Sequence, residues 1–198
     1  MHARPYLKKQ ALRVGATRLL SAAVLVLVFF CSEILLSADI PIASEAQVKA
    51  AFLFNFAKYV DWPASAFPDA KAPITIAVMG TDRFGEDLKH DVEGKTINGR
   101  SFVIKHIDSS SEMSHCHILF ISASEAARTD EILGKASVLP ILTVGENEMF
   151  ARNGGIINFV LKNGNVRFAI DLAAARKAGL SISSRLLMVA DTVKGNTK

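Results

Sequence analysis

Apolar residues recur along the chain with two different spacings, which separate the expected strands from the expected helices. Continuous apolar or β-rich runs predict strands, whereas apolar residues three or four positions apart predict helices. Strands are expected at residues 74–79, 102–107, 118–122, 141–144, 156–162 and 166–170, and helices at 84–92, from 124 or 129 to 136, at 172–178 and at 184–190. Helices that alternate with strands indicate an α/β fold: a layered, mainly parallel (mixed) sheet flanked by helices. Asn163-Gly164 joins the last two strands and predicts a late antiparallel hairpin.

A further helix is expected to begin at Ser44, before the first of these strands. Ser44 and Gln47 have the spacing of a capping box, in which each side chain accepts a hydrogen bond from the other residue's backbone amide. The helix is expected to stop before Trp62-Pro63, because a residue that precedes proline is pushed out of the α region. Its apolar residues at helical spacing, which predict a stripe facing the core, are Val48, Phe52, Phe56, Tyr59 and Val60.

Phe54 lies away from this stripe, on the side of the helix that carries Lys58. An aromatic side chain that faces outward is typical of a protein-binding surface. Phe54 and Lys58 are therefore the candidate partner surface. The alternative is that a neighbouring loop covers Phe54 and makes it part of the core.

The first 38 residues have the order of a secretory signal peptide. Five of the 23 Lys and Arg precede an uncharged apolar run at 19–32, and Ala38 supplies a small residue for cleavage. We therefore expect a signal peptide at 1–38 and export from the cytoplasm. The alternative is an uncleaved anchor over 19–36, which is near the minimum of ~17–25 residues that span a bilayer and contains the unfavourable Glu33.

The net charge of +4 comes entirely from the expected signal peptide, because the 18 basic and 18 acidic residues that follow Ala38 cancel. A nucleic-acid-binding protein needs a surplus of positive charge on one surface, so nucleic acid is not an expected partner. Residues 39–193 are expected to form a single folded domain, followed by a loose tail at 194–198. Cys116 is the only cysteine after the leader, which leaves no internal disulfide in the exported part.

The glycines at 80 and 85 have the spacing of a phosphate-binding loop, but the loop lacks the rest of the motif. Glu86 and Asp87 stand where that motif needs Lys and then Ser or Thr, and their carboxylates would repel phosphate. The sequence also has no G-x-G-x-x-G fingerprint for a dinucleotide. A tight strand-to-helix turn is the preferred interpretation, and no cofactor is expected.

Polar residues at the carboxyl ends of the expected strands are the candidate ligand-binding residues. Open α/β sheets bind ligands at these ends. The candidates for a small ligand are Thr81, Asp82, Ser122, Glu146 and the nearby Arg152.

His115-Cys116-His117 combines residue types that bind zinc and other metals. If these residues begin the strand at 118–122, both histidines share one face and Cys116 points to the other. His115 and His117 could then bind a metal only with ligands from elsewhere, as a metal-dependent hydrolase would require. The favoured interpretation is a buried cysteine with two edge histidines, and neither a metal nor a catalytic residue is expected.

Several blocks of the chain resemble, in order, the YfiR-like periplasmic family. The first is KAAFLFNFAKYV at 49–60, which leads to Trp62-Pro63. The others are CHILFIS at 116–122, ILTVGE at 141–146, GGIINF at 154–159, VRFAI at 166–170 and SSRLL at 183–187.

This resemblance implies a periplasmic α/β protein that regulates signalling and is not an enzyme. Some members of the family bind the periplasmic sensory part of an inner-membrane diguanylate cyclase and hold it inactive, which lowers cyclic di-GMP and biofilm formation. The alternative implied function is a module that senses a small periplasmic ligand for a membrane kinase or another receptor. A homodimer is also compatible with the family. Some members carry disulfides, but Cys116 alone gives no basis for an internal bridge here.

Overall fold

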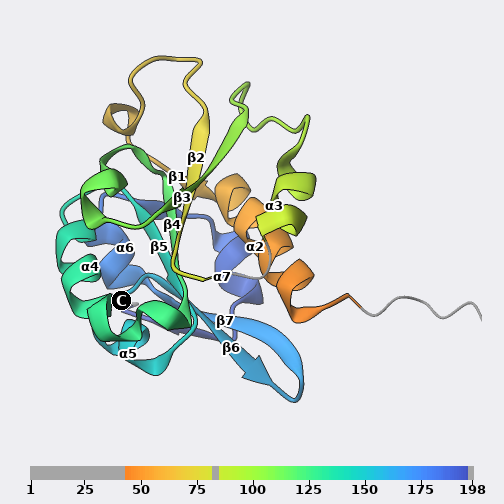
Figure 1. Ribbon diagram of the computed structural model, residues 1–198, viewed down its shortest axis with the longest axis vertical. Coiled ribbons are helices and arrows are strands. Elements are labelled where there is room, and N and C mark those ends of the chain that lie inside the picture. The colour runs from red at the N-terminus through yellow and green to blue at the C-terminus, as the bar shows by residue number, and fades with distance from the viewer. Residues whose placement is uncertain (1–42, 82–84, 196–198) are drawn as a thin grey trace, which may run out of the picture. The chain divides into compact units, whose positions relative to one another are not determined.

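A seven-stranded sheet crosses the part of the chain that the computed structural model describes, residues 43–81 and 85–195 (Figure 1). Its strands lie in the order β3-β2-β4-β5-β6-β7-β9. They are β2 (Ile74–Met79), β3 (Phe102–Ile107), β4 (Ile118–Ile121), β5 (Leu142–Gly145), β6 (Ile157–Lys162), β7 (Asn165–Asp171) and β9 (Thr192–Lys194). The expected signal peptide lies outside the described residues.

Strands β3, β2, β4, β5 and β6 pair in parallel, and β7 pairs antiparallel to β6. The predicted α/β class with a mainly parallel sheet and a late hairpin is therefore confirmed. Asn163 and Gly164 form the hairpin turn with φ angles of 52° and 75°, the positive values that a two-residue turn of this kind requires.

Helices cover both faces of the sheet (Figure 1). The apolar core on one face receives side chains from α2 (Glu45–Tyr59), α3 (Gly85–Val92), α6 (Leu172–Lys177) and α7 (Ser184–Val189). The core on the other face receives side chains from the 3₁₀ helix η2 (Ser110–His115), α4 (Thr129–Ala136) and α5 (Glu148–Arg152). The remaining 3₁₀ helices are η1 (Ala64–Ala66) and η3 (Ala123–Arg128). The described helices are all too short or too polar to cross a membrane.

Helix α2 begins as predicted, since the Ser44 and Gln47 side chains complete the capping box. The predicted stripe, however, is only partly right. Phe56 and Val60 are buried as predicted, but Val48, Phe52 and Tyr59 are only partly buried, and Ala50 and Leu53 are fully buried in their place. The helix is rotated relative to the prediction because it contacts both the sheet and α3, so two surfaces share its apolar residues.

Two strands of only two residues each form a second, smaller sheet. β1 (Val60–Asp61) continues directly from α2 and pairs antiparallel with β8 (Ser181–Ile182) in a separate two-stranded sheet. This pairing joins the end of α2 to the segment between α6 and α7. The sequence analysis predicts neither strand, because two residues show no period.

Candidate functional site

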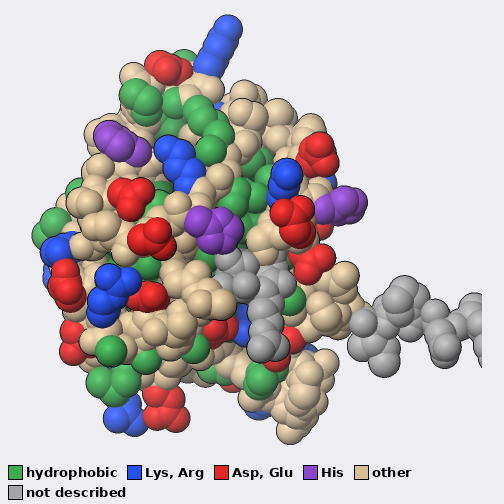
Figure 2. All heavy atoms as spheres, viewed as in Figure 1, with side chains coloured by type: hydrophobic (Ala, Val, Ile, Leu, Met, Phe, Trp, Pro, Cys, Tyr) green, Lys and Arg blue, Asp and Glu red, His purple; other side chains and the backbone are tan. Residues whose placement is uncertain are grey.

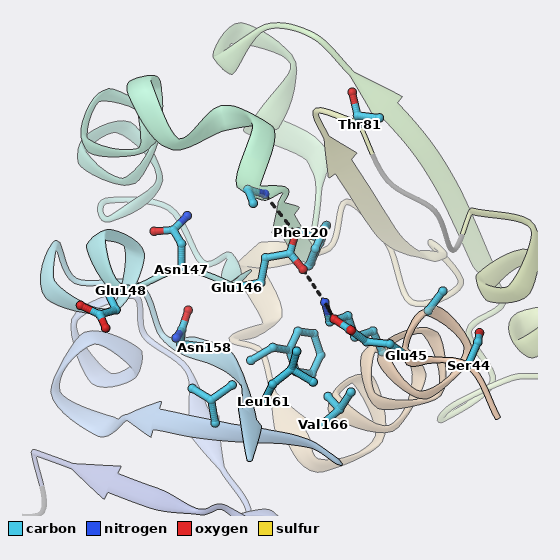
Figure 3. Close-up of a pocket in the computed structure, with 15 residues that line it drawn as sticks. Ser44, Glu45, Thr81, Phe120, Glu146, Asn147, Glu148, Asn158, Leu161 and Val166 are labelled. Carbon is cyan, nitrogen blue, oxygen red and sulfur yellow. Dashed lines mark hydrogen bonds and ion pairs between the residues drawn. The ribbon is translucent and has the colours of Figure 1, made fainter. Parts of the chain in front are cut away.

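A cleft of about 790 Å³ lies at the carboxyl ends of β4 and β5, between the first turn of α2 and strand β6 (Figure 3). Its described lining includes Ser44, Glu45, Lys49, Thr81, Phe120, Glu146, Asn147, Glu148, Asn158, Phe159, Leu161 and Val166. This volume is in the range of sites that hold small organic molecules. The cleft is therefore the candidate functional site.

Glu146 links three elements at the centre of the cleft. Lys49 of α2 donates a hydrogen bond to Glu146 Oε2 at 2.6 Å, and the backbone N–H of Ala123 donates to Oε1 at 3.0 Å (Figure 3). Lys49 also pairs with Glu45 one turn earlier on α2. Burial by itself lowers the pKa of Lys49, but hydrogen bonds to Glu146 and Glu45 and their negative charges outweigh burial and raise it. The ammonium group therefore stays charged and holds α2 to the strand ends.

One side of the cleft is apolar. Phe120 and Phe159 belong to the core beneath α2, and Phe159 lies 5.8 Å from the Phe56 ring, centroid to centroid. Leu161 continues this wall along β6 and is 61% exposed. An exposed leucine beside core aromatics provides a surface on which an apolar group can be buried.

The other side presents two side-chain amides with an unused polar atom. Asn147 caps α5, and its Oδ1 accepts a hydrogen bond from the backbone N–H of Phe150 at 2.7 Å. This bond fixes the amide, and the buried Nδ2 donor has no acceptor among the described residues. Asn158 on β6 is only 7% exposed, and its Oδ1 has no donor within the same part of the chain. Burial of an unpaired amide atom costs about 1–3 kcal/mol, so these two atoms mark a place where a partner is needed.

Two of the five predicted ligand-binding residues, Thr81 and Glu146, line the cleft. Ser122 is buried at its edge, and its hydroxyl donates to the Thr81 carbonyl oxygen at 2.6 Å. The Thr81 backbone N–H in turn donates to Ser124 Oγ at 3.0 Å. These hydrogen bonds join the loop that follows β2 to the loop that follows β4. The order of the strands in the sheet changes direction between these two strands, and the open cavity lies beside the next strand, β5.

Arg152 is not part of the described cleft lining and pairs with Glu148 one turn earlier on α5, at 3.2 Å. Its side chain is 71% exposed. Asp82 lies outside the described residues. Arg152 therefore affects the site only through the charge of Glu148.

The amino ends of the same strands are closed by an aromatic cluster. His117 lies just before β4, where its Nδ1 accepts a hydrogen bond from the Thr75 backbone N–H at 3.0 Å. Its ring stacks on Phe67, with 4.3 Å between ring centroids, and the Trp62 Nε1–H donates to the His117 carbonyl oxygen. The Arg100 guanidinium covers the other side of Phe67 at 3.7 Å. His117 is thus part of a closed structural cluster.

The surroundings of His117 favour its neutral form. Burial lowers its pKa, the positive charge of Arg100 lowers it further, and the Ala66 carbonyl opposes both. The ring Nε2 is buried and has no hydrogen-bond partner among the described residues.

His115 and Cys116 do not lie on the expected strand. His115 ends the helix η2, Cys116 follows it, and β4 begins only at Ile118, so the two histidines do not share a strand face. The difference arises because a capping box of Ser109 and Glu112 starts η2, and the helix continues through the buried Met113 to His115. Burial raises the pKa of the Cys116 thiol to about 12, which leaves it protonated and unreactive. Within residues 43–81 and 85–195, no group of three or more His, Cys, Asp or Glu is placed to hold a metal.

The candidate partner residues Phe54 and Lys58 lie on the outer side of α2. Phe54 is half-buried: its ring centroid is 5.5 Å from that of Phe102 on the edge strand β3, and Lys95 lies over its face at 4.7 Å. Lys58 is exposed. Part of the Phe54 ring therefore remains at the surface, next to an edge strand. On the face in Figure 2, acidic and basic side chains are interspersed.

Sequence reasoning missed Lys49, Asn147 and Asn158. A signal was present for Asn158, because it is the one polar residue in the apolar run at 156–161. Lys49 gave no such signal, since it lies 97 positions from Glu146 in the sequence.

Comparison with known proteins connects the described domain with a family. The sequence profile of a family described as YfiR/HmsC-like matches residues 46–191. A search of the curated proteins finds no match.

Two solved structures align with much of the chain. A conserved domain protein from Vibrio cholerae O1 biovar El Tor has a TM-score of 0.52 and 12% identity, over 76% of this chain and 60% of that chain. The ABC domain from Streptococcus pneumonia, in complex with L-Trp, has a TM-score of 0.49 and 12% identity, over 75% of this chain and 60% of that chain. The chain thus spans about three fifths of the length of each structure. The Vibrio cholerae structure supports the α/β fold alone.

Proposed function

The chain belongs to the YfiR/HmsC-like family, and from this premise we propose that it is a non-enzymatic periplasmic regulator of an inner-membrane diguanylate cyclase. In this role it binds the periplasmic sensory part of the cyclase and represses it. The result is less cyclic di-GMP and less biofilm. The observation that carries the proposal is the family match, which spans residues 46–191 and so includes nearly all of the described domain.

The partner surface that we propose is the outer side of α2, at Phe54 and Lys58. Phe54 offers part of an aromatic ring, Lys58 offers an exposed charge, and strand β3 lies beside them at the edge of the sheet. A rigid aromatic group beside an open strand edge suits contact with another protein.

The test is recovery of the partner from native membranes by the full-length protein with a C-terminal affinity tag, alongside a cyclic di-GMP measurement in a deletion strain. We expect recovery of a membrane diguanylate cyclase and raised cyclic di-GMP in the deletion strain. Recovery of no cyclase together with unchanged cyclic di-GMP would contradict the proposed function.

The surface is tested separately with Phe54→Asp and Lys58→Glu. Phe54→Asp is expected to weaken partner binding at least about tenfold, because it places a charge where the proposed complex buries an aromatic ring. Lys58→Glu reverses the charge of an exposed side chain and is expected to weaken partner binding less. Val138→Asp makes the same kind of change at a residue that is 79% exposed on another part of the surface, and serves as the control. Equal binding by all three variants would exclude this surface but not the function.

A second candidate function is the sensing of a small periplasmic molecule on behalf of a membrane kinase or another receptor. The observation that favours it is the cleft at the strand ends. The two candidates are distinguished by the protein that is recovered from membranes.

A further inference from the structure

We propose that the cleft binds a small amphipathic organic cation: an ammonium group with a neighbouring hydroxyl or carbonyl oxygen, attached to an apolar body. This ligand class is independent of the regulatory function above, because binding can be measured on the protein without any partner. Thr81 and Glu146, at the strand ends, are part of the site. Lys49, Asn147 and Asn158 add the features that select the ligand.

The size and the apolar wall define the body of the ligand. A cleft of about 790 Å³ has room for a molecule with a ring or a branched chain. Phe120 and Phe159 form the inner part of the wall, and Leu161 forms the exposed outer part. An apolar group of the ligand that covers Leu161 removes apolar surface from water, which favours binding.

The charges around the cleft define the sign of the ligand. The described lining carries three carboxylates, from Glu45, Glu146 and Glu148, and one ammonium group, from Lys49. Lys49 is already paired with Glu45 and Glu146, so it is not free to neutralise an incoming anion. Arg152 pairs with Glu148 just outside this lining, so the three carboxylates and two cations leave a net charge of −1. This negative charge favours a cation over phosphates and carboxylates.

The two amides define the polar end of the ligand. Asn158 is more than nine-tenths buried, lines the cleft, and has an acceptor oxygen that no described donor reaches. An ammonium N–H supplies that donor. Asn147 Nδ2 is a donor held in place by the helix cap, and it needs an acceptor such as a hydroxyl or carbonyl oxygen. Figure 3 places both amides on the same side of Glu146, and Phe120 on its other side. A ligand with both groups close together satisfies both amides.

The test compares four probes by isothermal titration calorimetry with the full-length protein. Phenylalaninol carries all three features: an ammonium, a hydroxyl and a phenyl ring. Phenyllactate keeps the ring and hydroxyl but is an anion, 3-phenyl-1-propanol is uncharged, and ethanolamine lacks the ring. Phenylalaninol is expected to bind at least about tenfold more tightly than each of the others, which corresponds to one missing charged or apolar contact.

Two variants connect this preference to the structure. Asn158→Leu replaces the unpaired amide with an apolar group of similar size, and is expected to weaken phenylalaninol binding about tenfold or more. Without ligand, the same variant is expected to raise the unfolding midpoint by roughly 2–4 °C, because a buried unpaired carbonyl is removed.

Glu146→Gln keeps the shape of the side chain and removes its charge, so it is expected to reduce the preference for phenylalaninol over phenyllactate. Glu131→Gln, at an exposed carboxylate on α4 outside the cleft, is the matched control.

The outcomes separate a binding site from a structural feature. Equal or stronger binding of phenyllactate would overturn the proposed charge, and no binding of any probe would mean that water alone hydrates the two amides. A lower unfolding midpoint for Asn158→Leu, with unchanged affinity, would show that Asn158 has a structural role only. If Asn158→Leu does not fold, the response of Glu146→Gln relative to Glu131→Gln decides the proposal.

Discussion

The two ends of the parallel strands bury polar side chains in opposite ways. At the amino end, His117 is enclosed by the rings of Trp62 and Phe67, and its Nδ1 is occupied by the Thr75 amide. At the carboxyl end, Asn158 has an unused oxygen beside an open cleft. His117 Nε2 is also buried without a hydrogen-bond partner among the described residues, but it lies within the aromatic cluster, whereas the oxygen of Asn158 borders the cleft. The two ends therefore differ in what surrounds the unpaired atom: aromatic rings at the amino end, and an open cleft at the carboxyl end.

The largest expected effect comes from Phe150, which closes the sheet beneath the cleft. Its ring is fully buried and fills the space beside Gly145 and Gly155, where an added Cβ would collide with the ring. Phe150→Ala is expected to lower the free energy of unfolding by about 3–5 kcal/mol in urea titrations. Met149→Ala, at a half-exposed residue of the same helix, is the control and is expected to cost less than about 1 kcal/mol. Similar losses for both variants would contradict this role for Phe150.

The next effect tests the aromatic cluster at the amino end. Phe67→Ala removes the ring between His117 and Arg100 and is expected to cost about 2 kcal/mol, less than Phe150→Ala because Phe67 is only partly buried. The same urea titration measures it. Phenylalaninol binding should not change, since the cluster lies at the other end of the strands. A loss of binding at unchanged stability would show that the two ends are not independent.

A smaller effect is expected at the helix cap that borders the cleft. Ser44→Ala removes the side-chain acceptor for the Gln47 amide and is expected to cost about 1 kcal/mol. Ser44→Asp keeps an acceptor at this position and should stay close to the unsubstituted protein. Thermal unfolding of the two variants checks the difference. Equal losses would mean that the cap contributes little to α2.

The smallest expected effect is a pH dependence at His117. Burial lowers its pKa in the folded state, so as the pH falls through 6.5 the unfolded chain takes up a proton before the folded protein does. The free energy of unfolding should therefore decrease below this pH. In His117→Asn, which keeps an acceptor for Thr75 but does not titrate, the decrease between pH 8 and pH 5 should be shallower. His90→Asn, at an exposed histidine, is the control and should follow the unsubstituted protein.

Much of the fold could be predicted because its signals are local. The strand at 74–79 has the predicted bounds, the Asn163-Gly164 turn joins β6 and β7, and the capping box starts α2. The face of α2 that is buried could not be predicted as well. It depends on where the sheet and α3 lie, and that information comes from distant parts of the chain.

The site was predictable only where it follows from the ends of strands. Thr81 and Glu146 were found by that rule, and both line the cleft. The same rule suggested Ser122 and Arg152, but the Ser122 hydroxyl is bonded to the Thr81 carbonyl oxygen and Arg152 is outside the described lining. A polar residue at a strand end is expected to lie near the candidate site, but tertiary packing decides whether its side chain lines the cleft or bonds to another part of the chain.

The position of α2 has a consequence for how the chain folds as it is made. Synthesis starts from the N-terminus, so α2 emerges before the strands that bury it. Lys49 cannot form its hydrogen bond until Glu146, 97 positions later, has been made. Phe56 likewise cannot pack against Phe159 and Phe168 until those residues have been made. Until the final hairpin is available, α2 can pack only against α3 and the earlier strands, and the core that it joins is incomplete. Chains truncated before β6 should therefore aggregate or be degraded, and folding should be completed only after nearly the whole domain has been synthesised.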